Sequence, residues 1–193
     1  MTWMQTRSGK SFDLLNPRAA DVDFEDIAYH LAHINRFNGA VGVYSVAQHC
    51  CLGSEYLDSI AAPIDHAFAF HLHDAHEAYI GDITRPAADA LSHGATLAPR
   101  AIHNLKHDLD AAIWAAAGFV PSLAALAVVG EVDLEMLRTE RDQLLGSSPS
   151  PWTAAVETSA PLPITIERWL PARAAHEWLV RFNDYRRALR AAA

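Results

Sequence analysis

Apolar and polar positions repeat with a helical period over most of this chain, and with a strand-like alternation only near its start. Residues 3–15 alternate weakly around a turn-like Arg-Ser-Gly-Lys at positions 7–10, which favours a small β-hairpin. Asp23 is a suitable N-cap, because its carboxylate can accept hydrogen bonds from the first backbone amides of a helix. We therefore expect a helix from Asp23 to about Phe37.

A long apolar run over residues 63–79 predicts a mostly buried helix. It is too long for an ordinary strand, and the proline at its start suits the first helical turn. Gly81 supplies a stop signal, because glycine readily adopts the left-handed conformation that ends many helices. The last turns of this helix would carry His73, Asp74 and Glu77.

The rest of the chain also favours helices. They are expected over residues 45–60, with Ser45 as N-cap, over residues 97–117 and 131–145, and as short pieces after residues 86 and 121. The Gly-Ser-Ser-Pro-Ser-Pro sequence that follows is the clearest loop. A last helix begins at Pro171 and has apolar side chains to bury.

These elements predict one domain over residues 1–193, an all-α bundle whose strands would be confined to the N-terminal hairpin. Within it, residues 1–22 form an N-terminal extension, residues 146–170 a loop, and residues 171–193 a C-terminal helix that docks back on the bundle. The part after the loop is too short to form an independent core.

Composition narrows the class of protein. At 193 residues, 51% of them hydrophobic, the chain can bury a real core. A formal charge of −8 with scattered Lys and Arg gives no electrostatic footprint for duplex nucleic acid. The adjacent Cys50 and Cys51 suggest free thiols in a reducing compartment. Since no signal peptide or run of roughly 20 apolar residues is evident, we expect a soluble cytoplasmic protein without membrane contact.

The candidate chemistry lies at the end of the central helix. Residues three and four apart share a helical face, so His73 and Asp74 can both lie beside Glu77. Burying so many ionisable groups is costly unless something binds them, and a divalent cation accepts both imidazole and carboxylate ligands. The remaining ligands must come from elsewhere, and His49 and Asp133 are the candidates. Two carboxylates about 4 Å apart repel by about 4 kcal/mol at an effective dielectric constant near 20, which also favours a cation.

The order of these residues resembles a known pattern. His49, His73-Asp74 and Asp133 follow the H…HD…D arrangement of the HD-domain metal-dependent phosphohydrolases. More closely, residues 3–145 resemble the bacterial 5′-deoxynucleotidase (YfbR-like) branch of that family. The segments that carry this resemblance are Arg36-Phe37, Ser-Val-Ala-Gln-His at 45–49, His-Asp-Ala-His-Glu-Ala at 73–78, Gly-Asp-Ile at 81–83, and Asp133.

The resemblance implies an HD-domain helical bundle that hydrolyses nucleotides, with 2′-deoxynucleoside 5′-phosphates as the expected substrates. His49, His73, Asp74 and Asp133 would hold one divalent transition metal ion, for which Mn²⁺, Co²⁺, Fe²⁺ and Zn²⁺ all remain open. The metal would activate a water molecule for attack on the phosphate.

The same resemblance assigns roles around the metal. Glu77 and Asp82 would be the catalytic residues, with Glu77 transferring protons and Asp82 lying near the sugar hydroxyl or the attacking water. Arg36 would hold the phosphate. Phe37 would pack on the sugar where the family has Trp, which leaves an apolar surface but removes the indole N–H donor.

Further side chains are candidates for weaker roles. Thr84, Arg85 and Lys106 are additional candidate substrate contacts, and Arg7 and Lys10 could also reach a phosphate. Convergence of two of these cations on the pocket would favour a triphosphate substrate. His71 and His76, which flank the ligand pair, are expected to have supporting or structural roles.

Other functions stay open at this point. A deoxynucleoside triphosphohydrolase, acting for example on dATP, would use the same metal core. Hydrolysis of a guanosine tetraphosphate alarmone is disfavoured, because that branch typically carries Glu-Asp where this chain has Glu77-Ala78. A nucleotide- or metal-binding sensor without turnover is the alternative from another class, although Glu77 and Asp82 argue against it. Association into a homo-oligomer is also left open.

Overall fold

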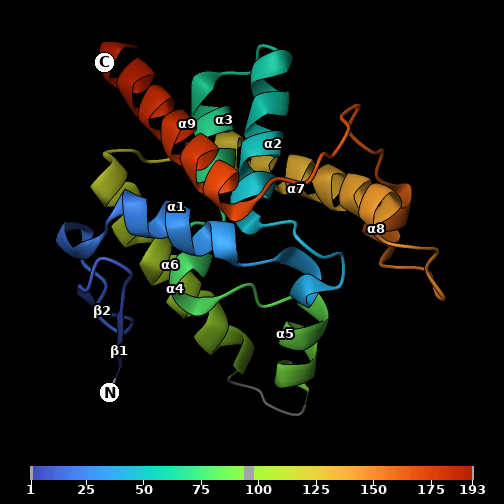
Figure 1. Ribbon diagram of the computed structural model, residues 1–193, viewed down its shortest axis with the longest axis horizontal. Helices are drawn as coiled ribbons and strands as arrows, with labels where there is room; N and C mark the ends of the chain where they lie inside the picture. The colour runs from blue at the N-terminus through green and yellow to red at the C-terminus, as the bar shows by residue number, and fades with distance from the viewer. Residues whose placement is uncertain (1, 94–97, 193) are drawn as a thin grey trace.

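The computed structural model describes residues 2–93 and 98–192 (Figure 1). The described chain is mainly helical and its strands form one small antiparallel sheet, so the prediction of an all-α bundle with an N-terminal hairpin is confirmed. The elements are β1 (Trp3–Gln5), β2 (Ser11–Asp13), the 3₁₀ turn η1 (Ala19–Asp21), α1 (Phe24–His33), the 3₁₀ turn η2 (Arg36–Gly39), α2 (Val46–Ser59), α3 (Ile64–Leu72), α4 (Glu77–Ile80), α5 (Arg85–Ser92), α6 (Ala98–Ala117), α7 (Leu123–Leu144), α8 (Ala154–Thr158) and α9 (Pro171–Ala192).

The N-terminal hairpin is tied to the bundle by an aromatic contact. Met4 of β1 pairs with Phe12 of β2 in antiparallel register, and Gly9 turns the chain between them with a φ of 85°. Phe12 is buried, and its ring stacks on that of Tyr79 in α4 with 3.8 Å between centroids. The hairpin therefore contributes a side chain to the core.

Helix α1 begins after the Asp23 N-cap, as predicted, but it ends at His33 rather than near Phe37. The chain leaves the helix because residues 35–45 pair with themselves at the start of α2. The backbone N–H of Arg36 donates to the carbonyl of Tyr44 at 2.9 Å, next to an antiparallel bridge. Arg36 and Phe37 consequently lie in η2, where Phe37 has a φ of 56°.

The central helix is interrupted, so the prediction of one continuous helix through Glu77 is wrong. α3 ends at Leu72, and a turn precedes α4. In this turn backbone amides bond three residues back, as from Glu77 to Asp74 at 3.0 Å. Nδ1 of His73 lies 2.6 Å from the carbonyl oxygen of Phe70. Local side chain–backbone bonds of this kind compete with the helical ladder.

α7 is a single helix, whereas the sequence predicted a short helix followed by a second one over residues 131–145. The Ser122 hydroxyl caps its N-terminus. Gly130 does not interrupt it: a glycine in a helix interior costs about 1 kcal/mol, which packing of α7 on α2 and α3 can offset. Asp133 therefore lies well inside the helix, with Glu140 two turns beyond it.

α9 lies across the bundle and packs on α1, α2 and α3 (Figure 1). Trp178 and Phe182 are buried in this contact. The segment before α9 is fastened by Gln48 of α2, whose side-chain amide donates to the carbonyl of Glu167 and accepts from the backbone N–H of Trp169. The segment before α9 and α9 itself thus both contact α2, the helix that carries His49.

The inward face of α6 carries Leu109 and Ile113, which are buried. The predicted start of this helix at residue 97 lies outside the described residues. Within the described part of the chain, none of the helices has the length and apolar content needed to traverse a bilayer.

α2 and α3 approach closely at Gly53. A Cβ added there would lie 2.0 Å from Cε1 of Phe70, so this approach requires glycine. His49 lies one turn before Gly53, and His73 follows Phe70 closely in the chain. The contact therefore helps to bring the two imidazoles together, with 5.3 Å between ring centroids.

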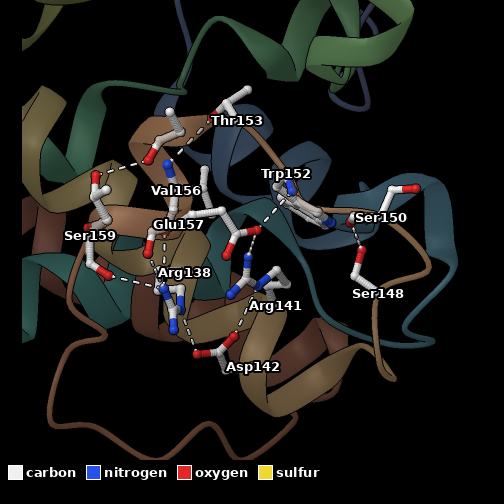
Figure 2. Close-up of polar contacts among 12 residues, drawn as sticks. Arg138, Arg141, Asp142, Ser148, Ser150, Trp152, Thr153, Val156, Glu157 and Ser159 are labelled. Atoms are coloured by element: carbon white, nitrogen blue, oxygen red, sulfur yellow. Dashed lines mark hydrogen bonds and ion pairs between the residues drawn. The ribbon is translucent and has the colours of Figure 1, made fainter.

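The segment over residues 146–170 is not a simple loop, because it contains α8, which the sequence did not predict. Two arginines of α7 hold it (Figure 2). Arg138 donates to the carbonyl of Glu157 at 3.1 Å, and Arg141 pairs with the carboxylate of Glu157 at 2.7 Å. Arg138 is itself paired with Asp142 at 2.7 Å. The segment is therefore folded back against α7.

Candidate metal centre

The four predicted metal ligands converge. Nε2 of His49 lies 3.2 Å from Oδ1 of Asp133, and Nε2 of His73 lies 3.1 Å from Oδ2 of Asp74. The crossed distances are similar, 3.9 Å from His49 to Asp74 and 3.7 Å from His73 to Asp133. The ligands come from α2, from the turn after α3, and from α7, so the packing of three helices builds the cluster.

The two imidazole nitrogens at the centre of the cluster lack ordinary partners. Nε2 of His49 and of His73 are buried and have no hydrogen-bond partner among the described residues. Leaving a buried polar atom unpaired costs about 1–3 kcal/mol. A divalent cation would take both nitrogens and the facing carboxylate oxygens as ligands. The buried cluster could therefore hold a divalent metal ion.

The cluster opens on one side. The side chain of His49 is fully buried, and those of His73 and Asp74 are 12% and 15% exposed, whereas that of Asp133 is 44% exposed. A small molecule would therefore approach along Asp133 rather than through α2.

Glu140 does not stand out in the sequence, yet it is fully buried beside His49. Its Oε1 lies 2.6 Å from Nδ1 of His49 and accepts a hydrogen bond from the Tyr44 hydroxyl at 2.8 Å. A carboxylate on Nδ1 fixes the tautomer and orientation that leave Nε2 free for a metal. One signal was available: Glu140 is two turns after Asp133, so both lie on the same face of α7.

Arg36 lies between this orienting carboxylate and the ligands. Its Nε and Nη2 are 3.0 and 2.9 Å from Oε2 of Glu140, and its Nη1 is 3.6 Å from Oδ2 of Asp74. Burial favours the neutral form, but the charge of Glu140 and the other carboxylates raises the pKa of Arg36 well above its ordinary value. The guanidinium is therefore charged, with its plane fixed by Glu140 and Nη1 toward the cluster.

The imidazole and carboxylate side chains attract one another by charge, although their contacts lack hydrogen-bond geometry, and this attraction keeps the carboxylates ionised. Burial raises the pKa of Asp74, but the adjacent His73 imidazolium outweighs burial and sets this pKa well below the ordinary value. Conversely, burial lowers the pKa of His73, while Asp74 and Asp133 raise it well above normal. The carboxylates are thus ready to bind a cation at neutral pH, and binding would release protons from imidazole.

Glu77 and Asp82 form a second kind of acidic pair. Glu77 is 4% exposed, and burial, followed by the charges of Asp74 and Asp82, raises its pKa to about 9. Burial also raises the pKa of Asp82, against the opposing effect of Arg36. Gly81, with a φ of 78°, ends α4 between them, as predicted. Carboxyl groups with raised pKa beside charged ligands are suited to proton transfer.

No protein-family model matches the chain. The uncharacterized protein YfdR of Escherichia coli (strain K12) is 32% identical over 185 residues, which are 95% of this chain and 96% of that protein. The chain belongs to the YfdR family. An uncharacterized protein of Rhodobacter capsulatus is also 32% identical, over 76% of this chain and 74% of its own length. Neither name states an activity.

Lys106 and Thr84 lie at different distances from the chemistry. The charge of Lys106, on α6, lowers the pKa of both Glu77 and Asp82, which places it near these two carboxyl groups. Thr84 directly precedes α5 and makes no side-chain hydrogen bond to cap that helix among the described residues. Lys106 is thus the better supported of these two candidate substrate contacts.

The other candidate cations are engaged elsewhere in the fold. The contacts are Arg85 with Asp89 at 3.1 Å, Lys10 with Asp23 at 2.7 Å, and the Arg7 guanidinium 4.1 Å from the ring centroid of Tyr29. Arg85 is also mostly exposed. None of these contacts brings the three cations to the metal ligands.

Phe37 lies beside Arg36, whose Cζ is 5.7 Å from the ring centroid of Phe37. A second aromatic side chain, which the sequence did not predict at the site, stands next to it: the ring of Trp152 lies 6.4 Å from that of Phe37. Trp152 comes from the segment before α8 that Figure 2 shows, where Arg141 packs over its ring at 5.7 Å. The expected apolar wall at Phe37 is therefore extended by Trp152.

The two flanking histidines differ. Nε2 of His71 lies 3.0 Å from the carbonyl oxygen of Trp178, and burial lowers the pKa of His71 to about 3. His71 is therefore a neutral structural residue, one of the two roles expected for it. Nδ1 of His76 lies 2.9 Å from Oδ1 of Asp110 on α6, and its Nε2 is buried without a hydrogen-bond partner among the described residues.

Proposed function

We propose that this protein is a metal-dependent phosphohydrolase acting on nucleotides, with 2′-deoxynucleoside 5′-phosphates as substrates. The observation that carries the proposal is the pair of buried imidazoles, His49 and His73, whose unpartnered Nε2 atoms face Asp74 and Asp133 within the described chain. A divalent cation held by these four side chains would polarise a phosphoryl oxygen and lower the pKa of water.

Arg36 supplies a charged donor for the phosphate. Glu140 holds one side of its guanidinium, while Nη1 makes only a 3.6 Å contact with Asp74. A phosphate oxygen at the ligand cluster would therefore meet a donor that is already oriented. Because Arg36 is charged at every relevant pH, it would serve all phosphate substrates alike.

Glu77 and Asp82 divide the proton transfers. With a pKa of about 9, Glu77 is protonated at neutral pH and can donate its proton to the sugar oxygen that leaves. Asp82 can accept the proton of the attacking water. Both groups lie beside Asp74, whose charge contributes to their raised pKa values.

A monophosphate is favoured over a triphosphate. A triphosphate would call for several converging cations beyond Arg36. Of the candidates in the described chain, Lys106 acts on Glu77 and Asp82, whereas Arg85 and the two N-terminal cations have partners elsewhere.

The apolar ring of Phe37 favours a deoxy sugar. Phe37 offers no hydrogen-bond donor or acceptor, so a 2′-hydroxyl buried against it would lose about 1–3 kcal/mol, or roughly a 5- to 150-fold preference for deoxy substrates. Phe37→Ala should admit water and narrow the ratio of kcat/KM for matched deoxy and ribo substrates. An unchanged ratio would show that another side chain selects the sugar.

The deciding experiment is a screen of chelator-treated protein reloaded with Mn²⁺, Co²⁺, Fe²⁺ or Zn²⁺. Matched deoxy- and ribonucleoside mono- and triphosphates are incubated with each form, and products are assigned by phosphorus NMR. We expect inorganic phosphate from deoxynucleoside monophosphates, and only with metal. Release of triphosphate would instead support a deoxynucleoside triphosphohydrolase. Metal-loaded protein that binds nucleotides but converts none would support a sensor.

A further inference from the structure

His76 has the same arrangement of ring contacts as the metal-facing His49. In His49, Nδ1 contacts a buried carboxylate of another helix, Glu140, at 2.6 Å. In His76, Nδ1 contacts Asp110 of α6 at 2.9 Å. In both, Nε2 is buried and has no hydrogen-bond partner in the part of the chain that the structure describes. A carboxylate on one ring nitrogen characteristically orients the other toward a metal.

Glu77 leaves a second buried atom unpaired at the same place. The residue is 4% exposed, and its Oε2 has no hydrogen-bond partner among the described residues. His76 is 5% exposed. Two adjacent residues thus bury an imidazole nitrogen and a carboxylate oxygen that no protein group of the described residues receives.

The side chains of Asp74, His76 and Glu77 are close enough to share one ion. A ring nitrogen of His76 and carboxylate oxygens of Asp74 and Glu77 all lie within 4.8 Å of one another. Ligands of a single transition-metal ion, each about 2.0–2.2 Å from it, are at most about 4–4.5 Å apart. Small side-chain adjustments would therefore complete the site.

The geometry points to a second divalent-cation site formed by Asp74, His76 and Glu77, next to the four-ligand site and sharing Asp74 with it. Asp74 belongs to both groups of potential ligands, His49–His73–Asp74 and Asp74–His76–Glu77. Its carboxylate has two oxygens and can therefore bridge two cations. Mixed imidazole and carboxylate ligands suit a transition ion better than Mg²⁺ or Ca²⁺.

A second cation would refine the proposed function of the same site, and only this part of the inference rests on that function. Paired cations about 3.5–4 Å apart stabilise both the attacking and the leaving oxygen of a phosphoryl transfer. In the two-cation form Glu77 would be a ligand, and the second cation would stabilise the leaving oxygen, which would then take up the proton that Asp82 has accepted from the attacking water. Asp82 keeps its role toward the attacking water.

The test counts Mn²⁺ bound to full-length protein that has been stripped with a chelator. Isothermal titration and elemental analysis should give two equivalents for the wild type, about one for His76→Gln, and none bound tightly for Asp74→Ala. Asp110→Asn should weaken only one of the two equivalents, by about 10- to 100-fold. The matched control is His103→Ala, an exposed histidine of α6, which should keep both equivalents.

Electron paramagnetic resonance adds an independent measurement. Two Mn²⁺ ions that share a carboxylate give an exchange-coupled spectrum, which should disappear in His76→Gln while circular dichroism stays unchanged. One equivalent in the wild type, or two coupled equivalents in His76→Gln, would overturn the inference. Protein that binds two coupled ions but hydrolyses no nucleotide would refute the proposed function alone, and an active one-cation enzyme would refute the second site alone.

Discussion

Helix α7 carries two groups of charged residues. They differ in whether other side chains of the protein pair with all of their charges and hydrogen-bonding atoms. Near its C-terminal end, Arg138 pairs with Asp142, and Arg141 pairs with Asp142 and Glu157, at distances of 2.7 to 3.0 Å (Figure 2). Every charge in this group meets an opposite charge of the chain. Such networks at the surface position a segment and contribute modestly to stability.

The second group on α7 is different. Asp133 and Glu140 face His49 from two sides, and His49 still has a buried Nε2 without a hydrogen-bond partner among the described residues. One group of charged residues on α7 therefore holds the segment around α8 by an ion pair with Glu157. The other group, Asp133 and Glu140, contacts His49. The comparison distinguishes side chains that still lack a partner, which a bound cation would supply, from side chains whose charges are already paired within the protein.

The largest expected effect is the loss of metal binding, and a matched pair of variants compares it between the two groups. Asp74→Ala removes a central ligand and should abolish tight metal binding and hydrolysis while leaving helicity largely intact. Asp142→Ala removes a carboxylate of the self-satisfied group and should keep both. Elemental analysis after dialysis, with circular dichroism as the check on folding, decides the matter. Full metal content in Asp74→Ala would mean that the site is wrongly assigned.

Glu77→Gln should lower turnover by roughly 10²- to 10⁴-fold, the range for loss of a general acid–base group. The amide has nearly the same shape but cannot give up a proton, and the four-ligand site should keep its cation. Glu157→Gln, in the self-satisfied group, is the control and should turn over normally. The measurement is kcat at saturating metal. Normal turnover of metal-loaded Glu77→Gln would exclude a part for Glu77 in the chemistry.

Glu140→Gln should weaken metal binding by about 10- to 100-fold, because residues that orient a ligand act on affinity by that amount. The charge opposite Nδ1 of His49 disappears, while the side-chain volume is conserved. The dissociation constant is measured by competition with a chelator. If Glu140→Gln binds metal as tightly as Glu157→Gln, the contact between Glu140 and His49 is purely structural.

A smaller effect concerns the pH dependence of stability in the metal-free protein. The pKa of Glu77 is about 9 in the fold, above its ordinary 4.5, so the folded state binds more protons than the unfolded state between these values. Its contribution to stability is therefore present at low pH and lost as pH rises toward 9. Glu77→Gln removes this dependence. From pH 6 to pH 9.5 the unfolding midpoint of the wild type should therefore fall relative to that of Glu77→Gln. If the difference between the two midpoints stays constant over this range, the raised pKa is contradicted.

The sequence was sufficient for the fold class and for the set of ligands that meet. His49, His73, Asp74 and Asp133 are candidate ligands because ionisable residues in apolar helical segments need a binding partner and because they follow the H…HD…D order, and the structure brings all four together. Periodicity also located most helices, since burial of one face is a local signal.

The ends of the helices, and the residues that orient the candidate ligands, depend on specific contacts, several of them between parts of the chain that are far apart in sequence. Local periodicity therefore could not predict them. α1 ends early because Arg36 pairs with the backbone of Tyr44, and α3 ends early where His73 contacts the carbonyl of Phe70. Glu140 has the appearance of an ordinary surface residue of a polar helix end. Only the folded positions of Arg36 and His49 make it a buried carboxylate with a role.

The contact between Arg36 and Glu140 joins residues that are 104 positions apart, and that between His49 and Glu140 spans 91 positions. At roughly 5–20 residues per second, a ribosome needs about 5–20 s to add the segment between Arg36 and Glu140. In the later part of that interval, after residue 74 has been added, the His73-Asp74 pair exists without the helix that completes its surroundings. The four side chains can therefore come together only after α7 has been synthesised.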